Sequence, residues 1–239
     1  VYEEEFSIHK GFFWSPDGSK IAFYVFDEEH VKQFEMEIYD HLYPSKYKFK
    51  YPKAGEQNSS LAIKVYDLNN NRTYNFDIGD EEDIYIPRIM WSKNNHELIV
   101  FRMNRLQNKL ELLSGKINDN VNPNSEIIVK NIYSEKSDTY IDIHDNTYFI
   151  NENQFLWTSE KDGYNHLYLI DYKNQKEIQL TSGEWEVSKM YGYNSNEKTI
   201  FFQAAKKSPT DREVYSLNID SKKLQLLSTS SGTNKAAFS

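Results

Sequence analysis

The chain has 239 residues, enough for one large domain or two small ones, and its 38% hydrophobic and 27% charged residues are typical of a globular protein. The net charge of −8 argues against a nucleic-acid-binding surface, which needs a basic face. Because the chain has no cysteine and no run of about 18 apolar residues, we expect no disulfide, no thiolate metal ligand and no membrane span.

The first six residues contain three consecutive glutamates, Glu3, Glu4 and Glu5, in a stretch that we expect to form a short helical turn. Two carboxylates can accept hydrogen bonds from a primary ammonium group and neutralise it. Adjacent residues on a helix do not face each other, so only long side chains at a helix end or in a turn can converge on one ligand. The alternative is a solvated acidic helix start, which the helix dipole favours.

A degenerate repeat follows, in which an aromatic residue, a polar turn and a hydrophobic strand recur. Its anchors lie at intervals of 77, 58, 44 and 45 residues, at Trp14, Trp91, Phe149, Tyr193 and Phe238. The last two intervals match a four-stranded propeller blade, and the first two match blades with insertions. We therefore predict blades over residues 10–80, 86–133, 139–182 and 187–228, with a further blade starting at 233–239.

Each repeat supplies two more strand-like runs separated by tight polar turns, such as 69–71 and 173–175; the last run of the second repeat covers 126–132. Alternating apolar and polar residues without helical periodicity predict an all-β fold. We expect a partial β-propeller of about four to five blades, which cannot close a typical ring, so the full protein should contain more blades. The alternative is a β-sandwich, which would lack the longer period.

Residues 27–55 interrupt the first repeat with a polar and aromatic stretch. Part of it alternates, as in residues 34–38, so we expect a projecting arm that could be two-stranded. An exposed aromatic arm usually packs against another surface.

Several chemistries find no support in the sequence. The spacing of the nine glycines excludes a G-x-S-x-G nucleophile elbow, a dinucleotide fingerprint and a P-loop. None of the six histidines forms an H-E-x-x-H or H-x-H pattern, so we predict no metal site and no cofactor, and we interpret the histidines as structural or solvated.

Several stretches resemble the propeller of dipeptidyl peptidase IV. They occur in the same order as in that family and cover nearly the whole chain. The first ones are the glutamate motif Val1–Phe6 with Phe13–Gly18, and Tyr51–Gly55 with Asn58. The later ones are Trp91 with Arg102, Asn104, Arg105, Gln107 and Asn108, then Gly163–Leu167 and Leu180–Val187. The glutamate motif and Y-P-K-A-G are specific to this family, whereas W-S-P-D-G is common among propellers.

The resemblance implies an eight-bladed propeller that caps an α/β-hydrolase domain of the same chain, in a serine peptidase that removes N-terminal dipeptides with Pro or Ala second. By position in the motif, Glu4 and Glu5 would bind the free N-terminus of peptide substrates, and Glu3 would flank them. The Ser-Asp-His triad would lie beyond residue 239, so this segment alone should be inactive. The arm 27–55 would help to form a homodimer.

Two departures limit the resemblance: Ser59 follows Asn58 where many relatives have Pro, and residues 140–146 align poorly with the segment that lines extended subsites. The sequence style suggests an exported bacterial protein, either periplasmic or secreted and on the cell surface. Two other functions stay open. One is a non-catalytic propeller that acts as a protein-interaction platform. The other is a carbohydrate-active propeller, which would need separated acidic residues around a central pocket.

Overall fold

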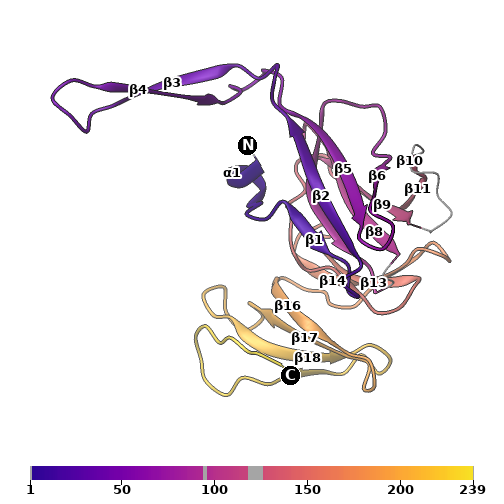
Figure 1. Ribbon diagram of the computed structural model, residues 1–239. Helices are drawn as coiled ribbons and strands as arrows, with labels where there is room; N and C mark the ends of the chain where they lie inside the picture. The colour runs from indigo at the N-terminus through magenta and orange to yellow at the C-terminus, as the bar shows by residue number, and fades with distance from the viewer. Residues whose placement is uncertain (1, 94–95, 118–125, 239) are drawn as a thin grey trace. The chain divides into compact units, whose positions relative to one another are not determined.

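The computed structural model describes residues 2–93, 96–117 and 126–238 (Figure 1). In these residues the one helix is α1 (Tyr2–Phe6), and every other regular element is a strand. The chain forms two compact units, Val1–Ile141 and Asp142–Ser239.

The first sheet of the first unit follows α1 directly. Its strands in sheet order are β1 (Phe12–Trp14), β2 (Lys20–Asp27), β5 (Ser60–Asp67), β6 (Arg72–Phe76) and β10 (Glu126–Ile127). The first four are antiparallel neighbours, whereas β10 pairs with β6 in parallel. The hairpin between β5 and β6 turns at Asn71, whose φ of 54° lies in the left-handed region that Asn tolerates well.

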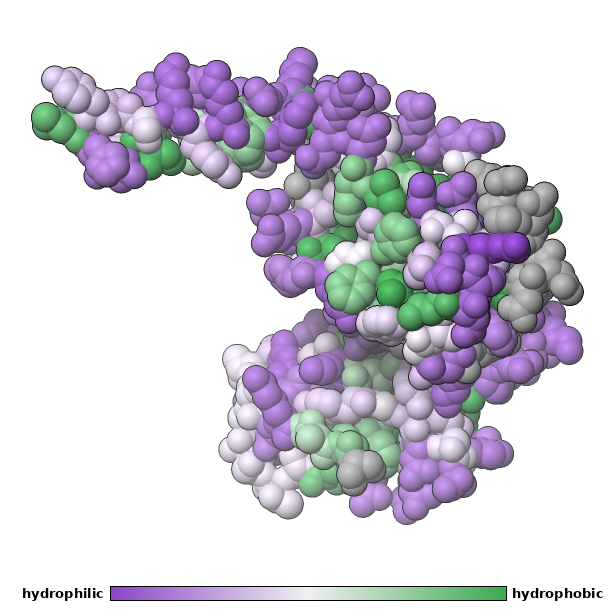
Figure 2. Space-filling model, viewed as in Figure 1, coloured by the Kyte–Doolittle hydropathy of each residue, from purple (hydrophilic) through white to green (hydrophobic). Residues whose placement is uncertain are grey.

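The arm is a separate two-stranded sheet inserted between β2 and β5. It consists of β3 (Gln33–Ile38) and β4 (Ser45–Lys50), and it extends away from the first sheet (Figure 1). Glu35 accepts ion pairs from Lys46 and Lys48 across the two strands, and these lysines hold the pKa of Glu35 at about 2. Hydrophobic side chains are exposed among hydrophilic ones along the arm (Figure 2). Leu42, in the loop between β3 and β4, is 91% exposed.

The second sheet has the order β11-β9-β8-β7. Its strands are β7 (Ile84–Trp91), β8 (Glu97–Asn104), β9 (Lys109–Lys116) and β11 (Val129–Lys136). The run expected at 126–132 is divided in the structure, because its first two residues join the first sheet as β10 and the fourth strand of the second sheet begins at Val129. Local alternation cannot show which sheet edge a strand will join, so this division was not predictable.

The core of the first unit contains side chains from both of these sheets, among them Ala22, Tyr24, Ile63, Val65, Tyr74, Phe76, Ile86, Trp91, Leu98 and Val100. The Trp91 indole donates a 3.0 Å hydrogen bond to the Phe13 carbonyl, which connects β7 with β1. The packing is close enough that a Cβ at Gly115 would meet the Phe76 ring at 2.4 Å. A side chain at this position would therefore displace the core.

The second unit contains two four-stranded antiparallel sheets. The first has the order β12 (Tyr148–Phe149), β13 (Gln154–Ser159), β14 (His166–Asp171) and β15 (Lys176–Gln179). The other has the order β16 (Val187–Asn194), β17 (Thr199–Ala204), β18 (Glu213–Asn218) and β19 (Leu224–Leu226). Their shared core includes Leu156, Leu167, Trp185, Ile200, Phe202 and Leu217. Four-stranded antiparallel meanders that follow one another along the chain are the arrangement of propeller blades, and both the all-β fold and the helical turn at the glutamates are confirmed.

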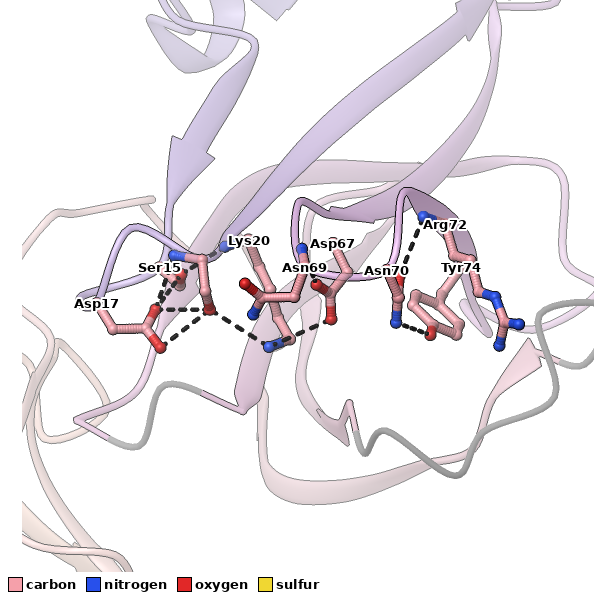
Figure 3. A network of polar contacts seen from close by, with 9 residues as sticks. Ser15, Asp17, Lys20, Asp67, Asn69, Asn70, Arg72 and Tyr74 are labelled. Atoms are coloured by element: carbon pink, nitrogen blue, oxygen red, sulfur yellow. Dashed lines mark hydrogen bonds and ion pairs between the residues drawn. The ribbon is translucent and has the colours of Figure 1, made fainter.

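One position pairs polar residues in each of the four larger sheets, where the second strand begins and the third strand ends. The pairs in register are Lys20 with Asp67, Glu97 with Lys116, Gln154 with Asp171, and Thr199 with Asn218. In the first sheet the pair is an ion pair with 3.4 Å between Lys20 Nζ and Asp67 Oδ2, and both side chains are 2% exposed (Figure 3). The repeat is therefore visible in the polar residues at this register position as well as in the strands.

A second repeated contact lies where one sheet leads to the next. The Val187 amide donates to the Asn165 carbonyl at 2.7 Å, and the Asn234 amide donates to the Arg212 carbonyl at the same distance. Residues 227–238 form no strand, although Thr233 makes an isolated bridge with Arg212. The start of a further blade at 233–239 stays a prediction, and this repeated contact supports it.

Candidate functional site

Helix α1 is held in place by aromatic side chains. A five-residue helix is too short to be stable by itself. Tyr2 and Phe6, four residues apart and therefore on one face, are both buried. The Tyr2 ring lies 5.0 Å from Phe26 and 5.9 Å from Tyr85, and the Phe6 ring lies 5.1 Å from Tyr85. Packing against β2 and β7 therefore stabilises α1.

The end of α1 is fixed by backbone contacts. Ser7 adopts a φ of 54°, which turns the chain out of the helix, and the Ile8 amide returns to the Tyr2 carbonyl at 3.1 Å. The Arg88 guanidinium donates a 2.6 Å hydrogen bond to the Phe6 carbonyl. A cation at a helix C-terminus satisfies an unpaired carbonyl and interacts favourably with the dipole. Arg88 therefore attaches α1 to β7.

The three glutamates occupy the exposed side of this anchored helix. The Glu5 Oε1 accepts a 2.7 Å hydrogen bond from the Nε2 of Gln107, in the hairpin between β8 and β9. Glu3 lies 4.0 Å from the Nδ1 of His9, but both side chains are mostly exposed, so this pair contributes little stability. The two candidate ligands, Glu4 and Glu5, thus project from one short and well-fixed helix.

The hairpin that carries Gln107 is itself attached to its surroundings. Arg105 donates 2.9 Å to the Asp83 carboxylate and 2.8 Å to the Glu56 carbonyl. The hydrogen bond to Asp83 raises the pKa of the Arg105 guanidinium, so this cation stays charged. The hairpin is therefore bound to the segment before β5 and to the segment before β7.

The Y-P-K-A-G stretch forms a turn beside this region. Gly55 has a φ of 82°, the Glu56 amide donates 2.9 Å to the Lys53 carbonyl, and the Lys53 amide donates 3.1 Å to the Glu56 carboxylate. Three residues after Gly55, the Asn58 side chain donates a 3.0 Å hydrogen bond from its Nδ2 to the Tyr85 hydroxyl, on the ring that packs against α1. Stretches that are far apart in the sequence therefore converge around the glutamate helix.

The family-like stretches of the second unit have structural roles. His166 is fully buried, with its Nδ1 3.0 Å from the Thr181 hydroxyl and its Nε2 2.9 Å from the Gly183 carbonyl. The Trp185 ring packs edge-on against it at 4.9 Å. In the described part of the chain, no group of three or more His, Cys, Asp or Glu residues could hold a metal ion, and no helix is long and apolar enough to cross a membrane.

A hollow of about 360 Å³ lies beside α1, on the side of Glu3 and His9. It is also lined by residues that precede β1 and by the base of the arm, including Lys10, Glu28, Lys50 and Pro52. Glu4 and Glu5 do not line it. The side chains of the candidate ligands are exposed on the first unit and lie outside this hollow.

The structure adds Gln107 to the residues that the sequence predicted. The sequence places it only within a family-like stretch, with no role. Its contact with Glu5 spans 102 positions, and nothing in a local pattern reveals such a pairing. The turn chemistry of residues 104–108 would have located the hairpin but not its partner.

The chain is similar to known proteins over nearly its whole length. The family model described as the dipeptidyl peptidase IV (DPP IV) N-terminal region matches residues 1–239. A probable dipeptidyl-aminopeptidase B of Arthroderma gypseum is 31% identical, with 96% of this chain and 28% of that protein covered. A dipeptidyl peptidase 4 of Trichophyton rubrum is 28% identical, with 93% of this chain and 30% of that protein covered. The chain thus spans less than a third of the length of these curated relatives.

The chain also resembles solved structures. The crystal structure of Porphyromonas gingivalis dipeptidyl peptidase 4 has a TM-score of 0.88 and 37% identity, and the match covers all of this chain and 33% of that one. A putative dipeptidyl aminopeptidase IV from Bacteroides ovatus has a TM-score of 0.80 and 27% identity over 94% of this chain and 34% of that one. Together with the succession of four-stranded sheets, this similarity identifies the fold as part of a β-propeller.

Proposed function

Because the chain belongs to the family of dipeptidyl peptidase IV N-terminal regions, we propose that it is the substrate-recognition propeller segment of a serine exopeptidase. This enzyme releases dipeptides, with Pro or Ala in the second position, from peptides that have a free N-terminus. The names of the matched relatives, which are dipeptidyl peptidases and dipeptidyl aminopeptidases, support this reaction class.

In this proposal the carboxylates of Glu4 and Glu5 accept hydrogen bonds from the substrate's α-ammonium and balance its charge. Charge-assisted hydrogen bonds of this kind are strong. The observation that carries the proposal is the anchoring of α1, since Tyr2, Phe6 and Arg88 fix the helix while its glutamates face outward. A fixed pair of carboxylates can set the distance between the N-terminus and the cleaved bond, which limits the product to two residues.

The other parts of the enzyme belong to the same proposal. The Ser-Asp-His triad is supplied by an α/β-hydrolase domain in the full-length chain, and the segment described here does not hydrolyse peptides by itself. The arm of β3 and β4 contributes to a homodimer, which its exposed apolar residues support. An exported location, periplasmic or secreted and on the cell surface of a bacterium, is also part of the proposal.

The test uses the full-length protein with Glu4→Ala and Glu5→Ala. Each substitution removes one partner of a desolvated charge pair, which typically costs about 3 kcal/mol or more. We therefore expect kcat/KM for dipeptide substrates to fall about 100-fold or more in each variant. The matched control is Glu3→Ala, which removes the same charge from the same helix and should leave kcat/KM within about twofold of the wild type.

Near-normal kcat/KM in both Glu4→Ala and Glu5→Ala would reject the assignment. A full-length protein that binds other proteins but cleaves no peptide would favour the non-catalytic propeller instead. The coding sequence beyond residue 239 separates the two functions independently, because the peptidase requires a G-x-S-x-G nucleophile elbow.

A further inference from the structure

Helix α1 alone does not fix the direction of the Glu5 carboxylate. Glu5 is exposed, and a long exposed side chain samples several rotamers around its three rotatable bonds. The 2.7 Å hydrogen bond from Gln107 Nε2 to Glu5 Oε1 restricts this freedom. The other Glu5 oxygen accepts no hydrogen bond from the described part of the chain, so it stays able to accept one from a ligand.

The Gln107 backbone is rigid. Gln107 has a φ of 54°, its amide donates 2.9 Å to the Asn104 carbonyl, and its carbonyl accepts 2.8 Å from the Ile141 amide. The Asn104 side chain closes the turn, because its Oδ1 accepts from the amides of Asn108 at 3.1 Å and Lys109 at 2.9 Å. The donor to Glu5 is therefore presented from a turn in which several hydrogen bonds fix the backbone.

The Gln107 amide has one possible orientation at this contact. A carboxylate only accepts hydrogen bonds, so the NH₂ group must face Glu5 and the Oε1 must face the interior. That Oε1 is buried and has no partner among the described residues. Leaving an acceptor unpaired is unfavourable, and such exceptions need an explanation. The hydrogen bond to Glu5 explains this exception, because it holds the Gln107 side chain in the orientation that leaves Oε1 unpaired.

The residue type at position 107 also suits binding of a cation. Glutamine donates a hydrogen bond without adding positive charge, so Glu5 keeps its full negative charge for an ammonium group. A Lys or Arg in this place would orient Glu5 equally well but would neutralise it and repel the incoming cation. Gln107 therefore orients the Glu5 carboxylate without changing the net charge of the site.

From these contacts we infer that Gln107 is a positioning residue for the substrate's N-terminus. It acts through Glu5, and the β8–β9 hairpin, together with α1, determines where the α-ammonium is held. This inference rests on the proposed function, in which Glu5 binds that ammonium.

The experiment compares Gln107→Met and Gln107→Lys with the wild type in the full-length protein. Methionine keeps the length of the side chain but cannot donate, so we expect KM for a dipeptide substrate to rise about 10-fold while kcat stays within about twofold. Lysine should raise KM further, because it pairs with Glu5 as a competing cation. Leu106→Ala, which truncates the exposed neighbour in the same turn, is the control and should leave both constants unchanged.

A double-mutant cycle separates positioning from general support of the fold. If Gln107 acts through Glu5, Gln107→Met should cause no further loss of kcat/KM in a Glu5→Ala background. An equal loss in both backgrounds, or an unchanged KM in Gln107→Met alone, would overturn the inference. If Glu5→Ala cripples the enzyme while Gln107→Met does not, the inference fails and the proposed function stands. If Glu4→Ala and Glu5→Ala are both near normal, the proposed function fails with it.

Discussion

The buried ion pair between Lys20 and Asp67 gives a sharp test of how the first sheet is stabilised. We predict that Lys20→Met strongly destabilises the first unit. The substitution keeps the length and much of the apolar contact of the side chain, but it leaves the Asp67 side chain, 2% exposed, without its cation. Asp67 would keep one hydrogen bond in the loop, a 2.9 Å contact from the Asn69 amide (Figure 3).

The magnitude follows from the burial of both partners. Breaking a buried pair by removing one ion typically costs about 3–5 kcal/mol, since the remaining charge is left uncompensated. The contact from the Asn69 amide offsets part of this cost, so we expect Lys20→Met to lower the free energy of unfolding by about 3 kcal/mol. The exposed pair of Lys198 and Asp220 provides the matched control, because Lys198→Met breaks an ion pair whose partners are 56% and 63% exposed. That loss should be about 0–1 kcal/mol.

The assay is hydrogen exchange of the paired strands β2 and β5 in the full-length protein, with urea unfolding as a second measurement. Lys20→Met should lower the free energy of opening of this strand pair, and Lys20→Met combined with Asp67→Leu should recover most of the loss, because no buried charge remains. The reasoning is refuted if Lys20→Met costs no more than Lys198→Met, or if the double variant is as unstable as Lys20→Met.

Three further predictions concern a glycine, an acidic turn and the arm. Gly183→Ala should destabilise the second unit by about 1–3 kcal/mol in urea unfolding, because Gly183 has a φ of +123° and the new Cβ would lie 2.7 Å from the Trp185 indole nitrogen. The control is Gly11→Ala, which has open space around it and should be nearly neutral in the same assay. The Ser15 hydroxyl and a backbone amide hold the pKa of Asp17 at about 2, below its ordinary value of 3.8. The stabilising contribution of Asp17 is therefore complete above pH 3.8 and is lost as the pH falls towards 2, so Asp17→Asn should weaken the acid dependence of the unfolding midpoint. If the arm forms the proposed dimer contact, Leu42→Ser should shift the full-length protein from dimer towards monomer in sedimentation velocity. An unchanged mass distribution would argue against this contact.

Much of the fold could be predicted because the signals are local. The aromatic anchors at Trp14 and Trp91, each followed by a polar turn and an apolar run, indicate where antiparallel hairpins form. The alternation in residues 34–38 likewise predicts a strand, and the structure places β3 there. The parallel pairing of β10 with β6 was missed, since a two-residue strand has too short a pattern to indicate its partner.

The candidate ligands could be named from the sequence, but the contacts that support them could not. Residue chemistry alone left Glu4 and Glu5 indistinguishable from a solvated acidic helix start, and only the order of the surrounding stretches raised their significance. The contact between Glu5 and Gln107 depends on how a distant hairpin packs beside α1. The hydrogen bond that anchors α1 likewise joins Arg88 to Phe6, which lie 82 positions apart in the sequence. Tertiary packing, rather than any local propensity, determines these contacts.

The most direct test of the glutamate pair measures the affinity of the full-length protein for two ligands that differ only in the α-amine. One is a dipeptide amide with Pro second, and the other is its desamino analogue. We predict that the wild type prefers the amine-bearing ligand by about 100-fold or more and that Glu4→Ala combined with Glu5→Ala abolishes this preference. A double variant that keeps the wild-type preference would contradict the assignment of these two residues to the substrate's N-terminus.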